Sequence, residues 1–147
     1  MRSIIQRVRN ASVVINGEEK RFIGRGLVVL LGVCSGDSRK DVDYIINKIL
    51  GLRVFPDQNG KMNYSVVDIK GEILVISQFT LCAETRKGKR PDFTNAAKPE
   101  DAEYLYKTFV DELRRSGLNV QTGTFAADML VEIFNEGPVT LVIDTPK

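Results

Sequence analysis

The sequence predicts an α+β domain in which a largely antiparallel, barrel-like β-sheet is covered by two helices. Two segments carry apolar residues at helical spacing, and short apolar segments bounded by turn residues precede, separate and follow them. This order of elements is typical of α+β domains. The chain has 147 residues, a length that fits one domain, which we expect to cover residues 1–147.

The strands are predicted from apolar runs and from the turns that bound them. Asn16-Gly17 is a strong hairpin signal because both residues tolerate positive φ, and Gly24-Arg25-Gly26 turns the chain into a buried run. These glycines are not a dinucleotide fingerprint, since the third glycine of that motif is missing. The expected strands cover residues 2–9, 12–15, 18–23, 27–33, 64–69, 73–76, 120–123, 128–135 and 139–144.

Two amphipathic helices are predicted to cover the sheet. The first follows a cap at Asp37 or Ser38 and runs to about Leu52. The second begins at Pro99, which suits a first helical turn, and stops at Ser116-Gly117. Each helix has one apolar stripe that we expect to face the core. The stripes consist of Val42, Ile45, Ile46, Ile49 and Leu50, and of Ala102, Leu105, Tyr106, Phe109 and Leu113.

The absence of histidine limits the chemistry that this chain can perform. It excludes Ser–His and Cys–His nucleophile pairs as well as zinc sites with histidine ligands. Any catalysis must therefore use carboxylates, lysine, backbone dipoles or the substrate itself. The net charge is only +2, so contact with a nucleic acid would depend on a local cluster of cations.

The sequence indicates a reduced, cytoplasmic protein. The longest apolar run, residues 26–34, is too short to cross a bilayer, and the first residues lack the pattern of a signal peptide. Cys34 and Cys82 are far apart and have no metal-type spacing. Two free, reduced cysteines are the simplest expectation.

The stretch from Glu72 to Leu81 changes character halfway along. Residues 73–76 are apolar without alternation, which predicts a strand buried on both faces. The polar residues Ser77, Gln78 and Thr80 then follow, with Phe79 among them. Because hydroxyl and amide groups are costly to bury unpaired, they either bond the backbone of a turn or face a ligand. The pattern alone slightly favours the turn.

A cluster of cations follows this stretch. Arg86, Lys87, Lys89 and Arg90 lie within five residues, around Gly88. Such a cluster fits a solvated loop or a patch that binds phosphates, and Gly88 would let the backbone approach a phosphate closely. The residues alone favour the solvated loop, and the position directly after the polar strand end adds weight to the phosphate-binding interpretation.

Five motifs together resemble one protein family. They occur in the same order as in the D-aminoacyl-tRNA deacylases and span essentially the whole chain. The motifs are Gln6-Arg7-Val8, Lys61-Met62-Asn63, Ser77-Gln78-Phe79-Thr80-Leu81, Lys87-Gly88-Lys89-Arg90-Pro91-Asp92-Phe93 and Gly137-Pro138-Val139-Thr140. Two positions differ from the common pattern: Ala126 stands where glycine is common, and Glu136 replaces an aspartate.

The resemblance implies a homodimeric enzyme that hydrolyses the ester between a D-amino acid and the 3′-terminal adenosine of tRNA, without a metal or an organic cofactor. It further implies that the Gly137-Pro138 bond is cis and enters the active site of the other subunit, where it excludes an L side chain. Glycine has no side chain to exclude, so glycine mischarged onto tRNA is an expected second substrate. Arg7 is expected to anchor Gly137-Pro138.

The resemblance also assigns site residues. It implies a catalytic group of Ser77, Gln78, Phe79 and Thr80, a substrate-binding group of Gly137, Pro138, Arg7 and Met129, and Arg86, Lys87, Lys89 and Arg90 as candidates for tRNA phosphate binding. The backbone N–H groups around Phe79 and Thr80 could hold the oxyanion of ester hydrolysis. No residue supplies a general base to Thr80, which favours a positioning role for Thr80 over a covalent one and favours assistance by the ribose hydroxyl of the substrate.

Two other functions remain open from the residues alone. A non-catalytic RNA-binding module would use the cations at 86–90 and ignore the attached amino acid. A general small-ester hydrolase would use Thr80 or Cys82 as its nucleophile.

Overall fold

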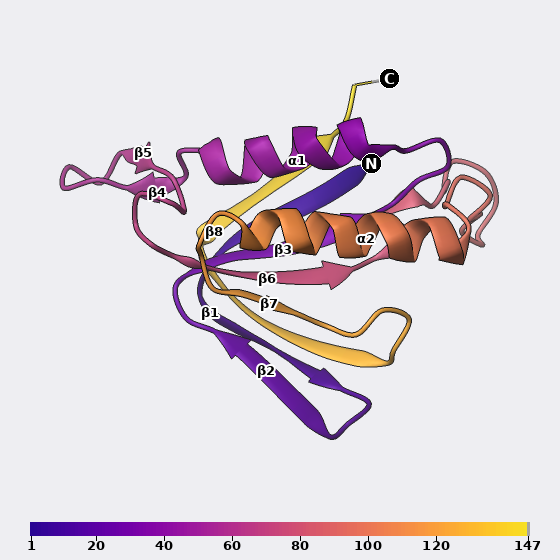
Figure 1. Cartoon of the computed structure of the whole chain (residues 1–147), viewed down its shortest axis with the longest axis horizontal. Helices are drawn as coiled ribbons and strands as arrows, with labels where there is room; N and C mark the ends of the chain where they lie inside the picture. The colour runs from indigo at the N-terminus through magenta and orange to yellow at the C-terminus, as the bar shows by residue number, and fades with distance from the viewer. Residues whose placement is uncertain (147) are drawn as a thin grey trace.

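Two helices lie side by side across a mixed, six-stranded sheet that curves into a nearly closed barrel (Figure 1). The computed structural model describes residues 1–146. No helix within those residues is long and apolar enough to span a bilayer. The elements are β1 (Arg2–Ile15), β2 (Glu19–Ile23), β3 (Gly26–Gly32), α1 (Arg39–Gly51), β4 (Phe55–Pro56), β5 (Met62–Tyr64), β6 (Glu72–Ser77), the 3₁₀ turn η1 (Phe79–Cys82), α2 (Pro99–Arg114), β7 (Val120–Thr122) and β8 (Met129–Asp144).

The long strand β1 organises the antiparallel part of the sheet. Its first half pairs with β3, its second half pairs with β2, and β8 pairs with both halves. The centre of the sheet is parallel, because β6 pairs in the same direction with β3 and with β7. The prediction of a largely antiparallel sheet is therefore wrong for this part. The connections that contain α1 and α2 are long enough to return the chain for parallel pairing.

Side-chain hydrogen bonds bring the two ends of the sheet together. The Nη1 of Arg21 on β2 donates to the carbonyl oxygen of Thr122 at 2.9 Å and to that of Gly123 at 3.3 Å. At the tip of the first hairpin, the backbone N–H of Asn16 donates to Asp128 O at 2.8 Å. The Arg21 bonds link β2 to the end of β7, where no strand ladder does, and the Asn16 bond extends the pairing of β1 with β8.

The core has two parts, and β6 contributes to both. Ile73 and Val75 face the helices, where they pack with the buried stripes of α1 and α2. Leu74 and Ile76 point into the barrel and pack with Val8 and other residues of β1. The prediction that β6 is buried on both faces is thus confirmed. The predicted helix stripes are buried as well, except for Leu50, which is half-buried.

Three strand predictions differ from the structure. β1 and β8 are each continuous where two strands were expected, because local bulges interrupt the pairing without ending the strand. Residues 66–70 form a turn where most of the strand expected at 64–69 should lie, and only Tyr64 belongs to a strand, β5. There the backbone N–H of Ser65 donates to the Asp68 carboxylate at 2.8 Å, and the backbone N–H of Asp68 donates to Ser65 Oγ at 3.1 Å. These local bonds compete successfully with strand pairing.

Cys34 and Cys82 form a disulfide, with their Cα atoms 5.6 Å apart. The expectation of two reduced, unconnected cysteines is therefore wrong. The separation of 48 residues in the sequence does not predict this bridge, because only the packing of η1 against the end of β3 brings the two sulfur atoms together. Gly32 permits that packing: a Cβ there would lie 2.9 Å from the Cβ of Leu81 and 3.0 Å from Gln78 O.

Candidate active site

The polar residues after β6 lie where the strand leaves the core. Ser77 and Gln78 are half-buried, and the backbone N–H of Gln78 donates to Leu31 O at 2.8 Å, which extends the pairing with β3. The chain then turns sharply through η1, and Phe79 and Thr80 become exposed. The buried strand thus delivers a short polar segment to the surface at a defined position.

A cavity of about 540 Å³ opens beside this segment. Its lining includes Ser77, Gln78, Phe79 and, from β8, Met129. Most of the remaining lining is apolar, and Asp128 is the one ionisable side chain among the described residues that form it. The fold therefore gathers four of the predicted site residues, Ser77, Gln78, Phe79 and Met129, around one apolar cavity.

Two adjacent backbone donors, one on a lining residue and one on the residue after it, are unused. Phe79 and Thr80 occupy the first two positions of η1, where N–H groups have no partner within the turn. Neither N–H donates to an acceptor anywhere in residues 1–146. The segment can therefore offer two adjacent N–H groups to an oxygen atom of a bound molecule.

Thr80 lies next to Gln78 but outside the cavity lining. Its Oγ1 accepts a hydrogen bond from the side-chain Nε2 of Gln78. No carboxylate, lysine or other base within residues 1–146 forms a hydrogen bond with the Thr80 hydroxyl. Thr80 is thus held by an amide and has no group beside it to remove its proton.

Residues 136–139 form a bulge on β8, which we call the β8 bulge. Gln6 pairs with Thr140, and Val8 pairs with Asn135. The first two residues are two positions apart on β1, whereas their partners are five positions apart on β8. The Gly137-Pro138 peptide bond inside the bulge is cis, and Gly137 has a φ of +129°, which favours glycine. Both residues are exposed and neither lines the cavity.

The β8 bulge is tied down from both sides. Arg7 is 9% exposed; its Nε donates to Glu136 O at 3.1 Å and its Nη1 donates to Val54 O at 2.6 Å. On the other side, the Asn135 side chain accepts a bond from the Val139 N–H at 3.0 Å. The bulge is therefore a fixed projection and not a loose loop.

The predicted phosphate-binding residues lie on a small hairpin of residues 84–92, which we call the basic hairpin. Its base is closed by two backbone bonds between Glu84 and Asp92, of 2.8 and 3.0 Å. Arg86 bonds the Glu84 carboxylate, and this hydrogen bond, with a second from the Arg86 N–H, lowers the pKa of Glu84 to about 2. Three exposed cations of the hairpin form no ion pair within the described residues: Lys87, Lys89 and Arg90.

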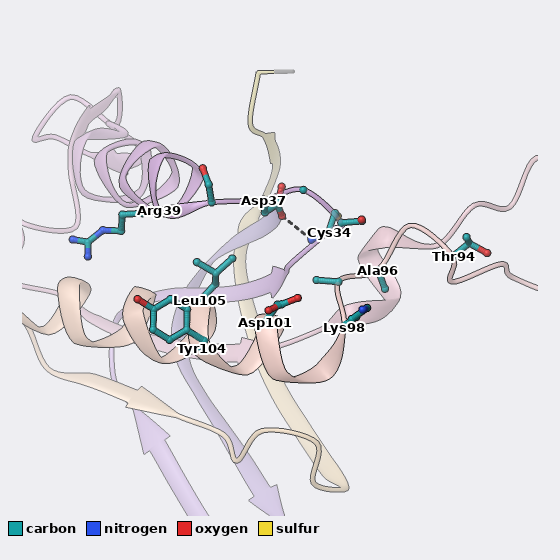
Figure 2. A pocket seen from close by; sticks show the side chains of 13 residues that line it. Cys34, Asp37, Arg39, Thr94, Ala96, Lys98, Asp101, Tyr104 and Leu105 are labelled. Atoms are coloured by element: carbon teal, nitrogen blue, oxygen red, sulfur yellow. Dashed lines mark hydrogen bonds between the residues drawn. The ribbon is translucent and has the colours of Figure 1, made fainter.

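A second cavity lies between the first turns of α1 and α2 (Figure 2). Asp37 on its wall accepts a 2.6 Å hydrogen bond from the Cys34 N–H, while Lys98 and Asp101 flank the start of α2. The lining mixes acidic and basic groups and contains none of the predicted site residues. Ala96 and Ala97 line both cavities and so separate them. The cavity beside Ser77 is therefore the candidate active site.

The described part of the chain has no cluster of typical metal-ligating side chains. Residues 1–146 contain no group of three or more histidine, cysteine, aspartate or glutamate side chains that could hold an ion. The apolar lining and the free N–H groups of Phe79 and Thr80 suit a molecule that has an apolar part and an oxygen atom that accepts hydrogen bonds.

Two residues of interest have features that periodicity does not reveal, although the glycine common at position 126 in the resembling family is a signal for a positive φ there. Ala126 lines the cavity with a φ of +61°, a conformation that alanine rarely adopts. Phe93 packs against Phe79 with a centroid separation of 5.1 Å. Both features depend on loop conformation, which periodicity and spacing do not predict.

Known proteins match this chain over essentially its whole length. A family model described as D-Tyr-tRNA(Tyr) deacylase matches residues 4–144. A protein of Clostridium tetani (strain Massachusetts / E88) named D-aminoacyl-tRNA deacylase is 52% identical over 147 residues, covering 100% of this chain and 99% of the relative. A protein of the same name from Aquifex aeolicus (strain VF5) is 52% identical over 145 residues, covering 99% and 98%.

Solved structures share the fold. One titled c-Myc DNA Unwinding Element Binding Protein has a TM-score of 0.93 and 44% identity, with full coverage of both chains. Another, titled as a structural analysis of a probable eukaryotic D-amino acid tRNA deacylase, has a TM-score of 0.86, covers 98% of both chains and is 18% identical. The second likeness concerns the fold alone.

Proposed function

The chain belongs to the D-Tyr-tRNA(Tyr) deacylase family, and we propose that it hydrolyses the ester bond between a D-amino acid and the 3′-terminal adenosine of tRNA. The observation that carries the proposal is the match of the family model over residues 4–144, in a chain whose Ser77–Phe79 segment lines an apolar cavity. Residues 1–147 would act as one deacylase domain.

The reaction needs a group that stabilises negative charge on the ester carbonyl. When water attacks the carbonyl carbon, its oxygen becomes an oxyanion, and the free N–H groups of Phe79 and Thr80 would donate to it. One such donor typically contributes about 10²–10³ in rate. Collapse of the intermediate breaks the bond to the ribose oxygen of the adenosine, and this leaving group takes up the proton that the attacking water gives up.

We assign Thr80 a positioning role. Its hydroxyl is bonded to Gln78 and lacks a neighbouring base, so it is poorly suited to act as a nucleophile. The vicinal hydroxyl of the terminal ribose is the nearest group that could assist the attacking water. An aminoacyl-tRNA ester is intrinsically reactive toward hydrolysis, and this mechanism requires no histidine, metal or organic cofactor.

A homodimer would complete the site. In the described residues β8 pairs only with β1, so its other edge is free over its whole length. Its outward face exposes three apolar side chains, Leu130 (66%), Phe134 (57%) and Val142 (62%). A long edge strand with exposed apolar residues is a template for association with another chain. The β8 bulge lies on this strand and would enter the cavity of the partner.

The β8 bulge would set the choice between D- and L-amino acids. Gly137 and Pro138 are exposed and held in place by Arg7, which suits a rigid wall. Backbone carbonyls in the space of an L side chain would exclude L-amino acids while the D side chain points elsewhere. This exclusion does not depend on the identity of the side chain, so many D-residues, and also glycine, should be accepted.

The basic hairpin would bind tRNA phosphates through Lys87, Lys89 and Arg90, with Arg86 partly neutralised by Glu84. Because aminoacyl-tRNA is made and used in the cytoplasm, we place the enzyme there. The disulfide would then face thiol reductants, which oppose such bonds in that compartment.

The deciding experiment compares release of radiolabelled amino acid from D-Tyr-tRNA, L-Tyr-tRNA and Gly-tRNA, with a chelator present. We expect fast release from D-Tyr-tRNA, measurable release from Gly-tRNA and no release from L-Tyr-tRNA. Release from both tyrosyl esters would leave a general esterase and refute the role of the β8 bulge. Binding of tRNA without release from any ester would instead establish a non-catalytic RNA-binding module.

A matched pair of glycine variants tests the bulge directly. At Gly137 an added Cβ would lie 2.9 Å from Val139 Cγ2 and 3.0 Å from Arg7 Nη2, whereas at Gly117 it would meet nothing within 4 Å. Both glycines have positive φ, +129° at Gly137 and +81° at Gly117, so Gly117→Ala also carries backbone strain but lacks the close contacts with Val139 and Arg7. Gly137→Ala should reduce D-Tyr-tRNA hydrolysis at least tenfold, and Gly117→Ala should leave it near the wild-type rate.

A further inference from the structure

Two aromatic rings meet on the surface where the cavity adjoins the basic hairpin. The rings of Phe79 and Phe93 have centroids 5.1 Å apart and planes inclined by 59°. Phe79 also lines the cavity, and Phe93 follows directly after the base of the hairpin. The pair therefore connects the lining of the candidate active site to the base of the hairpin that carries the cations.

Both rings are unusually open to solvent for apolar side chains. Phe79 is 55% exposed and Phe93 is 39% exposed, although burial of a phenylalanine side chain normally stabilises a fold. A tilted pair of this kind is a favourable aromatic geometry and still leaves ring faces uncovered. The contact thus orients the two rings without burying them.

The backbone around Phe93 is well determined. The two Glu84–Asp92 bonds close the hairpin on one side, and the Ala96 N–H donates to Phe93 O at 2.9 Å on the other. The Asp92 carboxylate also accepts the Thr94 N–H at 2.8 Å. Phe93 is therefore presented by a fixed turn and not by a mobile loop.

Exposed aromatic rings next to a line of cations are the features that proteins use to bind single-stranded nucleic acids. The rings stack on bases, and the cations follow the phosphates. Lys87, Lys89 and Arg90 supply the positive charge at this site, with no ion pair to neutralise them within residues 1–146. A second copy of this chain is a poorer occupant, because its hairpin would bring the same cations to the contact.

We propose that Phe79 and Phe93 form a stacking platform for the unpaired bases that precede the terminal adenosine in the 3′ end of tRNA. The inference rests on the proposed function, because it takes the cavity as the place of the terminal adenosine. The base next to that adenosine stacks on the Phe79–Phe93 pair, and the phosphates beyond it run along the basic hairpin.

The test distinguishes two roles of Phe93: packing against Phe79, and stacking on a base of the RNA. Phe93→Leu keeps an apolar side chain against Phe79 but removes the aromatic face, and Phe93→Trp keeps a face. The substrates are D-Tyr-tRNA and D-tyrosyl-adenosine, which lacks the preceding bases. For Phe93→Leu we expect kcat/KM on D-Tyr-tRNA to fall roughly tenfold relative to kcat/KM on D-tyrosyl-adenosine. The loss should lie in KM, and Phe93→Trp should restore it.

A binding measurement makes the result independent of catalysis. A fluorescein-labelled RNA oligonucleotide that ends in CCA should bind Phe93→Leu roughly tenfold more weakly than the wild type in fluorescence anisotropy. Equal affinity of the two proteins would overturn the platform, whether or not D-Tyr-tRNA is hydrolysed. If the wild type fails on both ester substrates, the proposed function is wrong, and the oligonucleotide still decides the platform.

Two further outcomes would overturn the inference. An equal loss on both ester substrates would show that Phe93 only supports the cavity through Phe79. A change from dimer to monomer in sedimentation velocity for Phe93→Leu would show that the aromatic pair is a subunit contact.

Discussion

Arg7 holds the backbone of Glu136, the residue that precedes Gly137, through a 3.1 Å hydrogen bond from its Nε. The same guanidinium donates to Val54 O at 2.6 Å, so one side chain fixes the β8 bulge relative to the segment before β4. A lysine would keep the charge, but its single ammonium group cannot reproduce the planar, forked geometry that serves both carbonyls.

Arg7→Lys should therefore loosen the β8 bulge. We expect the free energy of unfolding to fall by about 1–3 kcal/mol, because a buried carbonyl loses its partner. We also expect hydrolysis of D-Tyr-tRNA to fall at least tenfold while the discrimination against L-Tyr-tRNA weakens. Urea unfolding and the two-ester assay measure these effects. An unchanged D/L ratio would show that Arg7 is not needed to set the bulge.

The Cys34–Cys82 bridge should stabilise the fold without taking part in catalysis. Closing a loop of this length is expected to contribute about 4 kcal/mol, mainly by restricting the unfolded chain. The double variant Cys34→Ser/Cys82→Ser and the reduced wild type should therefore unfold at the same, lower denaturant concentration. Both should still hydrolyse D-Tyr-tRNA. Loss of turnover in the double variant with retained folding would instead favour Cys82 as a nucleophile.

Ala126→Gly should stabilise the protein. Ala126 has a φ of +61°, and glycine adopts this conformation without the steric penalty that alanine meets, so we expect a gain of about 0.5–1 kcal/mol. Ala127→Gly is the matched control, since Ala127 has no positive φ and its replacement should destabilise. Thermal unfolding of the two variants should move in opposite directions. Because Ala126 lines the cavity, KM for D-Tyr-tRNA should also change in the first variant.

Stability should fall at high pH through Tyr106. Its hydroxyl donates to Val75 O at 3.0 Å, and burial raises the pKa of Tyr106 to about 12, compared with about 10 in an unfolded chain. Between these values the unfolded chain has lost a proton that the folded chain retains, so this contribution is complete below pH 10 and is lost as the pH rises through 12.

The expected loss is about 3 kcal/mol, because each pKa unit corresponds to about 1.4 kcal/mol. Tyr106→Phe should lack this part of the pH dependence, and the difference in unfolding free energy between wild type and variant should narrow from pH 10 to pH 12. Parallel pH profiles for the two proteins would contradict the assignment. Tyrosinate absorbance, compared between the two proteins, reports the ionisation itself.

The helices and the first hairpin could be predicted because their signals are local. Ser38 caps α1 and its N–H bonds Asp41 at 2.8 Å, Pro99 begins α2, and Asn16 and Gly17 have the positive φ angles expected of the turn. The parallel pairing of β6 and the Cys34–Cys82 bridge could not be predicted in this way. Both depend on residues far apart in the chain that only the tertiary fold brings together.

The candidate site could likewise be predicted only in part. The motif residues Ser77, Gln78 and Phe79 reach one cavity because a buried strand ends there, as the change from apolar to polar residues indicates. Sequence reasoning did not predict that Phe93 would pack on Phe79 or that Ala126 would adopt a positive φ. Those features follow from the conformation of two loops, each fixed by backbone hydrogen bonds to other segments.

The separation of the cavity from the β8 bulge within one chain has a genetic consequence. Since neither Gly137 nor Pro138 lines the cavity of its own chain, each active site of a proposed dimer would need segments from two polypeptides. A chain with a damaged Phe79–Thr80 segment and a chain with a damaged bulge would therefore complement one another. Co-expression of the two inactive alleles should restore roughly a quarter of the wild-type activity, because half of randomly assembled dimers are mixed and each mixed dimer has one intact site.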